Sequence, residues 1–363
     1  MLYYLTNSLL IQDNHPDYYL VLGAIKRLGL SVVESNHLVS GDYDILKKVS
    51  EWFCNDFELS PLFSKLVENY ATQGIPSFIN YYIEIVLGNP IIRTDGKRII
   101  AQLHPCDISR SENIAAASLI VEDLNDACFY EHVLDWYIRR NKICANFKYD
   151  KVHGGGGRIT DVIKEELGKK HVAISIIDTD KRYPTYDINK KDTYKKCKRL
   201  GRRAVYYKFQ PLDVHEIENL IPVNYIDKLP DWQTETGRIK RKSFEYLRAK
   251  AEDILPYFDI KKGIRKDKII EDVEYRKFAQ QCYELNAELF AVDSDFNSYL
   301  DSRAEKDIVY YGLIEGLMKK VLDIIKNGEM PEPSLYEFQS INWCIISENM
   351  INWFVARNKE SLY

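Results

Sequence analysis

The sequence predicts an α/β fold in which a central parallel sheet is flanked by helices. Short apolar runs bounded by polar residues recur through the middle of the 363-residue chain, and such runs are typical of strands buried on both faces. Segments with apolar residues at helical spacing separate these runs, and this alternation predicts right-handed crossovers between parallel strands. Three acidic clusters directly follow apolar runs, at the strand ends where ligands of parallel sheets bind.

Residues 1–115 are expected to form a mixed, mainly helical region. Apolar residues at helical spacing predict helices over 18–28, 43–57, 61–70 and 75–87. Two β-rich runs flank Asp95-Gly96, a dipeptide typical of hairpin turns. No combination of residues in this region indicates catalysis, so we expect it to contact a partner protein, a second copy of the chain or nucleic acid.

Residues 116–225 are expected to contain the parallel sheet. The apolar runs predict strands over 118–122, 172–178 and 204–209, with a short strand-like piece at 147–152. Helical spacing predicts the helices 126–139, 158–167 and 191–200. Four glycines, Gly154 to Gly157, indicate a tight turn whose backbone can approach a phosphate. The stretch lacks the GKS or GKT ending of a Walker loop, so ATP binding is not expected.

Residues 226–363 are expected to be entirely helical and to cover one side of the sheet. Helical spacing is found over 240–254, 269–285, 306–325 and 336–354. The clearest break lies at 328–333, which contains Gly328 and Pro333.

The acidic clusters at the predicted strand ends are the strongest chemical signal. They comprise Glu122 with Asp126, Asp178 with Asp180, and Glu216 with Glu218. If the strands are neighbours, the carboxylates converge on one edge of the sheet and repel one another unless a cation joins them. Carboxylate oxygens favour hard divalent cations, so the expected cofactor is Mg²⁺ or Mn²⁺.

Structural interpretations of these acidic residues stay open. Asp178 and Asp180 point the same way because they are two positions apart, but they can equally form a polar turn after a strand. Asp126 stands near a predicted helix N-terminus, where an acidic side chain can cap the helix or favour its dipole. The acidic pair of the third cluster can stabilise a helix N-terminus in the same way.

The same residues resemble the TOPRIM fold, most closely the TOPRIM nucleases of the OLD and PARIS types from bacterial anti-phage systems. The resemblance is carried by Glu122 with Asp126, by Asp178-Thr179-Asp180 and by Glu218 in the sequence EIEN. It covers about a third of the chain. A glycine usually follows the first glutamate in that family, whereas this chain has Asp123, a residue that tolerates tight turns. The resemblance implies that Glu218, more than Glu216, faces the metal.

A metal-dependent endonuclease is the activity that the resemblance implies. Two ions held by the acidic residues would activate a water and stabilise the leaving oxygen of a phosphodiester. Lys181, directly after the aspartates, is predicted to offset charge on the phosphate, with Arg182 and Lys208 as alternatives. Basic residues are dense at 139–142, 190–203 and 238–242 and would hold the flanking phosphates. DNA is favoured over RNA as the substrate.

The resemblance also implies partners. OLD proteins usually carry an ATPase domain that this sequence does not show, so an ATPase or sensor subunit encoded nearby is expected to act with a defence effector. A homo-oligomer stays open. Two other functions remain: a catalytically degenerate TOPRIM scaffold, suggested by Asp123 in place of glycine, and a nucleotidyl-transfer enzyme of the primase kind, against which the lack of a zinc-finger pattern counts.

Composition predicts a folded, cytoplasmic protein. The net charge of −4 excludes a protein whose whole surface is basic, but it is compatible with a local basic stripe. The seven cysteines occur without a CxxC pair, as expected of free thiols in a reducing compartment. The N-terminal stretch lacks the basic region and cleavage site of a signal peptide. No apolar run approaches the about 18 residues that span a bilayer, so no membrane partner is expected.

Overall fold

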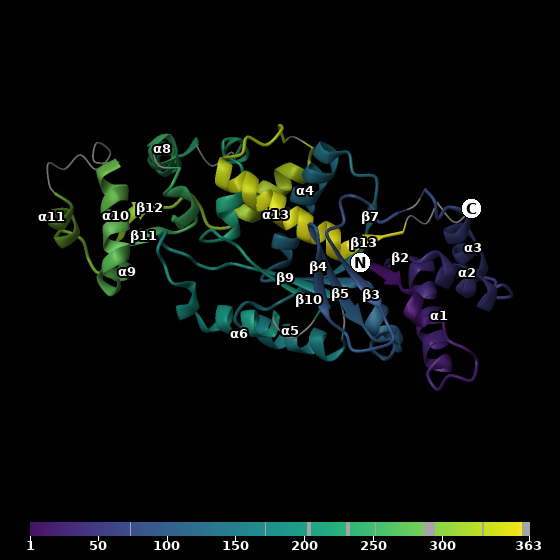
Figure 1. Ribbon diagram of the computed structural model, residues 1–363. Coiled ribbons are helices and arrows are strands. Elements are labelled where there is room, and N and C mark those ends of the chain that lie inside the picture. Colours follow the sequence, from purple (N-terminus) through teal and green to yellow (C-terminus); the bar gives the residue numbers. More distant parts are fainter. Residues whose placement is uncertain are drawn as a thin grey trace. The chain divides into compact units, whose positions relative to one another are not determined.

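The computed structural model describes residues 1–72, 74–170, 172–201, 205–229, 233–250, 252–285, 295–328 and 330–357 (Figure 1). The chain divides into two compact units. Unit 1 comprises Met1–Ile176, Lys196–Gln210 and Ile345–Tyr363, and unit 2 comprises Ile177–Lys195 and Pro211–Cys344. Unit 1 therefore contains segments of all three predicted regions. The prediction of an α/β fold with a parallel sheet is confirmed.

The first sheet of unit 1 has five strands in the order β2-β1-β3-β5-β4. These are β1 (Leu2–Leu5), β2 (Leu38–Gly41), β3 (Tyr81–Ile85), β4 (Ile92–Asp95) and β5 (Arg98–Leu103). The strands pair in parallel except for β4, which runs antiparallel to β5. Asp95 pairs with Arg98 across a two-residue loop, so the predicted hairpin at Asp95-Gly96 is confirmed.

The N-terminal region is richer in strands than predicted. Its helices α1 (Tyr18–Val33), α2 (Tyr43–Trp52) and α3 (Leu59–Glu68) lie near the predicted ranges. The helix predicted over 75–87 was wrong, because this range contains β3. The strand sequence YYIEI combines aromatic and β-branched residues, which fit a pleated sheet between two neighbouring strands.

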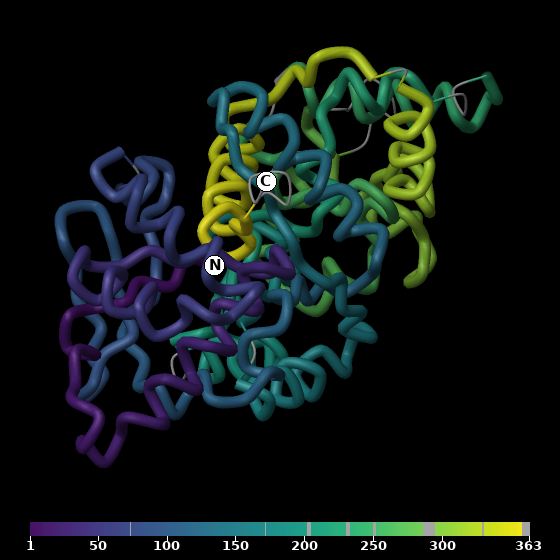
Figure 2. The backbone as a smooth tube through the Cα atoms, turned by 90° about the vertical axis from the view of Figure 1, so that its right-hand side faces the viewer, coloured from purple at the N-terminus to yellow at the C-terminus, as the bar shows by residue number. Residues whose placement is uncertain are grey.

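The core under this sheet draws on both ends of the chain. Leu2, Ile79, Tyr82, Ile100 and Val355 are buried together. The backbone nitrogen of Met1 donates a hydrogen bond to the Val355 carbonyl at 2.6 Å. In agreement with this hydrogen bond, Figure 2 shows the purple start of the chain beside the yellow end of the C-terminal helix.

The second sheet has four strands in the order β10-β9-β6-β8. These are β6 (Ala117–Val121), β8 (Tyr149–His153), β9 (Ala173–Ile177) and β10 (Tyr207–Pro211). Strand β6 pairs in parallel with β8 and with β9, and Leu119 lies opposite both Lys151 and Ile174. Every residue of β6 and β9 is buried, as the continuous apolar runs predicted. Parallel pairing brings the carboxyl ends of β6 and β9 to one edge.

Helices separate these strands as predicted. They are α4 (Leu124–Asn141), α5 (Ile159–Gly168) and α6 (Asp192–Gly201). The chain moves to one side of β6 to form β8 and to the other side to form β9, so right-handed crossovers place α4 and α5 on opposite faces. In Figure 1 these two helices lie above and below the sheet.

The prediction that residues 226–363 are entirely helical was wrong. The helices there are α8 (Glu235–Lys250), α9 (Lys266–Glu271), α10 (Val273–Leu285), α11 (Phe296–Asp301), α12 (Leu317–Lys326) and α13 (Glu337–Phe354), with the short α7 (Val223–Ile226) just before. Strand β11 (Gly263–Arg265) pairs antiparallel with β12 (Ile308–Tyr311), and β13 (Val355–Ala356) pairs with β7 (Asn146–Phe147).

A close backbone approach explains why the helix predicted over 306–325 begins as a strand. The run Ile308-Val309-Tyr310-Tyr311 has β-branched and aromatic residues that favour the extended chain. Gly312 follows it, and a Cβ there would lie 2.5 Å from the Gly263 nitrogen. Only glycine allows β11 and β12 to meet at this point. Among the described residues, no helix is both long and apolar enough to cross a membrane.

Candidate metal centre

The segment after β9 carries the second acidic cluster and is tied to residues 214–215. The buried Thr179 donates its hydroxyl to the Val214 carbonyl at 2.7 Å, and the Asp180 amide donates to the His215 carbonyl at 2.8 Å. Asp180 has a φ of +46°, in the left-handed region that few residues other than glycine, asparagine and aspartate adopt. These two hydrogen bonds hold the backbone at Thr179 and Asp180 against residues 214–215.

The third acidic cluster is held by the 3₁₀ helix η6 (Ile217–Leu220). Asp178 Oδ1 accepts a hydrogen bond from the Ile217 amide at 3.0 Å, which joins the end of β9 to the start of η6. The Glu216 amide donates to Asn219 Oδ1, and Asn219 Nδ2 donates to the Leu255 and Phe258 carbonyls. These contacts orient the Glu216 carboxylate on a rigid support.

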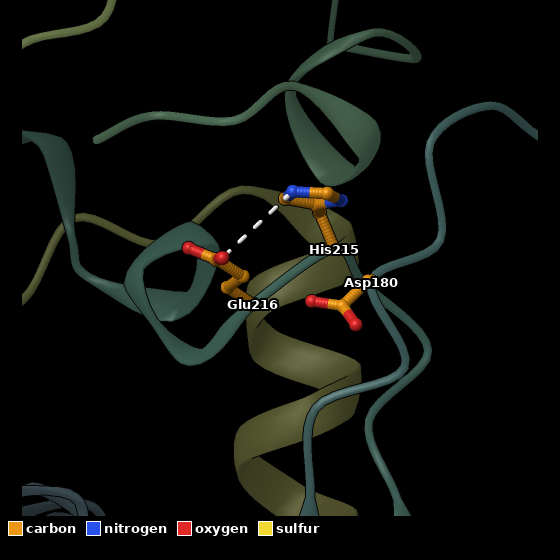
Figure 3. Close-up of side chains that lie close together, drawn as sticks. All are labelled: Asp180, His215 and Glu216. Carbon is orange, nitrogen blue, oxygen red and sulfur yellow. Dashed lines mark ion pairs between the residues drawn. The ribbon is translucent and has the colours of Figure 1, made fainter. Parts of the chain in front are cut away.

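Asp180, His215 and Glu216 form a group that can hold a metal ion. Each offers one ligand atom, and these atoms all lie within 4.8 Å of one another (Figure 3). Two oxygen ligands of one Mg²⁺ are at most about 4.2 Å apart, so a small movement of the side chains completes the arrangement. An imidazole beside two carboxylates suits Mn²⁺ or Zn²⁺ better than Mg²⁺, which prefers oxygen alone.

His215 lies between two carboxylates. Its side chain is 8% exposed, and Nε2 is 3.9 Å from both Glu216 Oε1 and Asp259 Oδ2. Its Nδ1 is 3.2 Å from the Lys181 carbonyl. Burial acts to raise the pKa of Asp259, but hydrogen bonds from His215 and from the Lys262 amide lower it below its ordinary value. Asp259 therefore stays ionised beside the imidazole.

Two lysines balance the acidic charge. Lys191 pairs with Asp180, and Lys261 Nζ lies 2.8 Å from Glu216 Oε2 and 3.2 Å from Glu218 Oε1. Burial alone would lower the pKa of Lys261, but the two glutamates raise it above its ordinary value. Lys261 is therefore a permanent cation at neutral pH.

Glu218 is the most buried carboxylate of the cluster. Its side chain is 7% exposed, and its Oε2 has no hydrogen-bond partner within the described part of the chain. Burial raises the pKa of Glu218, and the attraction of Lys261 lowers it without cancelling the effect of burial. A buried carboxylate oxygen with no protein donor is suited to a cation or a proton.

Lys181, predicted to face the phosphate, pairs with Asp213. Its Nζ is 2.8 Å from Asp213 Oδ1 and 5.0 Å from the centre of the Tyr257 ring. Asp213 is 81% exposed, so the ion pair is weak and Lys181 can exchange Asp213 for a phosphate.

The first acidic cluster lies in unit 1 and supports a helix start. Asp123 Oδ1 accepts from the Asn125 amide at 2.8 Å, and Asp126 Oδ2 accepts from the Asp123 amide at 3.0 Å. This reciprocal capping box begins α4. It accounts for an aspartate where the TOPRIM family commonly has glycine, and it gives Asp126 the capping role left open by the sequence.

Glu122 and the glycine turn lie beside the end of β6. Glu122 is half-buried and contributes, after burial, to raising the pKa of the Cys197 thiol on α6 to about 11. The Gly154 amide donates to the Val121 carbonyl at 2.7 Å, and a Cβ on Gly154 would lie 2.8 Å from that oxygen. Gly155 and Gly156 both have positive φ, so the four glycines form a tight turn.

The structure thus groups part of the predicted site and adds residues to it. In unit 2, Asp180 and Glu216 lie close to His215, Glu218 is joined to Glu216 by Lys261, and Asp178 supports η6. Sequence reasoning missed Asp259 and Lys261 and gave His215 no role as a ligand. The sequence His215-Glu216-Ile217-Glu218 was the signal for His215, since it puts an imidazole beside two carboxylates after a strand.

Comparisons with protein-family models, with curated proteins and with solved structures gave no match. The TOPRIM resemblance therefore stays a prediction from the sequence.

Proposed function

We propose that this protein is a metal-dependent endonuclease whose divalent ion is held by Asp180, His215 and Glu216. The observation that carries the proposal is the convergence of their ligand atoms within 4.8 Å. A second observation supports it, because the buried Glu218 Oε2 lies in the same cluster and has no hydrogen-bond partner among the described residues. Mn²⁺ fits this donor set best, and Mg²⁺ is the alternative.

A divalent ion at this position lowers the pKa of a bound water and polarises a phosphodiester oxygen. Residues of the chain orient the imidazole, hold a proton and bind the phosphate. The Lys181 carbonyl, 3.2 Å from His215 Nδ1, is placed to orient the imidazole so that Nε2 can face the ion. Glu218 is suited to hold a proton, because its pKa is raised by burial. Lys181 can leave its exposed partner Asp213 and bind a phosphate oxygen.

Helix α6 supports a nucleic-acid substrate. Cys197 is its one buried residue. The exposed basic residues of α6 are Lys195, Lys196 and Arg199, and the exposed Lys190 comes just before the helix. A row of cations on one helix binds successive phosphates without reading the bases, so binding should weaken steeply with salt. We propose DNA as the first substrate to test and RNA as the second.

The defining experiment compares wild type with Asp180→Ala/His215→Ala on supercoiled DNA and on total RNA, in Mn²⁺, in Mg²⁺ and in EDTA. We expect metal-dependent cleavage in the wild type and at least about a 100-fold loss in the double variant. Glu271→Ala is the matched control, since Glu271 is an exposed carboxylate of unit 2 that pairs with Lys268. Equal cleavage by the double variant and the control would refute the proposed site.

A non-catalytic binding subunit is the second candidate, and the lysines favour it. Lys191 and Lys261 already pair with Asp180, Glu216 and Glu218 in the chain itself. The two ammonium groups offset two of the three carboxylate charges without a metal. A binding subunit would show no rise in melting temperature with millimolar Mn²⁺, whereas a metal enzyme would.

An effector role in anti-phage defence, with an ATPase or sensor partner, belongs to the proposal through the sequence resemblance alone. Cells that carry the gene with its neighbours should resist phage, and Asp180→Ala/His215→Ala should abolish resistance without lowering protein abundance. Resistance that survives in the double variant would favour the binding subunit.

A further inference from the structure

Lys261 lies where a second metal ion would be expected. Its ammonium group is 2.8 Å from one oxygen of Glu216 and 3.2 Å from one oxygen of Glu218. The side chains are 25% exposed for Lys261, 12% for Glu216 and 7% for Glu218. A cation between two carboxylates that are buried to this extent reduces the repulsion between them, as a bound metal ion would.

The Glu216 carboxylate faces two cation positions. Its Oε1 is 3.9 Å from His215 Nε2, on the side of the group formed with Asp180, whereas its Oε2 pairs with Lys261. In two-metal hydrolases the ions lie about 3.5–4 Å apart, close enough to share one carboxylate. Here the carboxylate is shared between the candidate metal position and an ammonium group.

The backbone of Lys261 is fixed, so this contact does not depend on a free loop. The Asp259 side chain accepts from the Lys262 amide at 2.7 Å, and the Asp259 carbonyl accepts from Gly263 at 2.8 Å. The Ile260 carbonyl accepts from the Leu313 amide at 2.6 Å, which ties the turn to the segment after β12. The turn therefore presents Lys261 to the two glutamates in a set position.

We infer that this centre binds one divalent ion per chain and that the Lys261 ammonium is its resident second cation. The inference rests on the proposed function. The ion takes Asp180, His215 and Glu216 Oε1 as ligands and displaces Lys191 from Asp180, whereas Glu218 stays with Lys261. The two ions implied by the sequence resemblance are thereby replaced by one ion and one lysine. Activity should rise with Mn²⁺ concentration with a Hill coefficient of one.

Removal of the lysine should open the second position. Equilibrium dialysis of the full-length chain against Mn²⁺ should give one bound ion for wild type and two for Lys261→Ala. The control Lys262→Ala removes a neighbouring exposed ammonium and should still bind one. Adding Glu218→Gln to Lys261→Ala should return the count to one, because the second position then loses its buried carboxylate.

Electron paramagnetic resonance of wild type, saturated with Mn²⁺ and then freed of unbound ion by gel filtration, tests the inference without any variant. A single ion per chain gives an uncoupled six-line signal, whereas two ions that share Glu216 give an exchange-coupled spectrum. Two ions in wild type, or one ion in a folded Lys261→Ala variant, would overturn the inference and leave the proposed nuclease standing. No bound Mn²⁺ in wild type would overturn both.

Discussion

The acidic residues of the two units look alike in the sequence but have different cations around them in the structure. In unit 2, Asp180, Glu216 and Glu218 contact an imidazole and two ammonium groups. In unit 1, Asp126 receives a backbone amide in the capping box of α4. A capping box also begins η6 at Glu216, so the ammonium groups rather than the cap distinguish unit 2.

The difference shows that carboxylates after similar strands can meet ammonium groups or a backbone amide. A carboxylate that accepts backbone N–H groups at a helix start is stabilised by the helix itself. Carboxylates that lie near one another under burial need a cation, and unit 2 supplies Lys191 and Lys261. Three predictions test this contrast between carboxylates that pair with ammonium groups and a carboxylate that accepts a backbone amide. They follow in order of decreasing effect.

The largest effect is expected for Lys261→Met, which keeps the volume of the side chain and removes its charge. Glu216 and Glu218 are then left close together without their cation. Loss of one partner of a buried ion pair costs about 3–5 kcal/mol, so the free energy of unfolding should fall by about 3 kcal/mol. Urea denaturation at pH 7 in EDTA measures this decrease in the free energy of unfolding.

Two further variants control this prediction. Lys262→Met changes an exposed neighbour and should alter the free energy of unfolding by less than about 0.5 kcal/mol. Glu218→Gln combined with Lys261→Met should recover part of the loss, since one of the two buried charges is gone. Equal stability of Lys261→Met and wild type would show that the cluster does not depend on this lysine.

The sequence predicted the second sheet well and strands β3 and β12 poorly. The runs before Glu122 and Asp178 are continuous and apolar, so burial on both faces was evident without knowledge of the partners. Strands β3 and β12 lie in ranges where the apolar residues fitted a helical spacing equally well. Their identity is decided by pairing with β1, β5 and β11, which are remote in the sequence.

The candidate site was predictable only where it is local. Asp180 and Glu216 each follow an apolar run, and His215 is adjacent to Glu216. Lys261 and Asp259 carry no motif, because they reach the site through a turn that β11 and β12 hold. Sequence spacing therefore indicates carboxylates at strand ends and does not indicate which cations meet them.

An intermediate effect is expected for Asp126, where two substitutions separate capping from metal binding. Asn can still accept the Asp123 amide, whereas Ala cannot. Asp126→Ala should lower the free energy of unfolding by about 1 kcal/mol, and Asp126→Asn by a few tenths. Both should bind Mn²⁺ as wild type does, which dialysis measures. A 10-fold or greater loss of Mn²⁺ affinity in Asp126→Asn would support the sequence prediction that Asp126 is a ligand.

The smallest effect concerns the thiol of Cys197, which reports on Glu122 without perturbing the fold. The Cys197 pKa of about 11 means that only about one thiol in 1,000 is ionised at pH 8. Glu122→Gln removes a negative charge that disfavours the thiolate, so the pKa falls and alkylation by iodoacetamide at pH 8 should speed up by about 2- to 5-fold. Peptide mass spectrometry assigns the modified cysteine, and the exposed Cys54 should react at the same rate in both proteins. If the alkylation rate of Cys197 is the same in Glu122→Gln and in wild type, Glu122 does not face α6. If Mn²⁺ speeds alkylation in wild type and not in Glu122→Gln, Glu122 binds the ion, and the contrast between the acidic residues of the two units no longer holds.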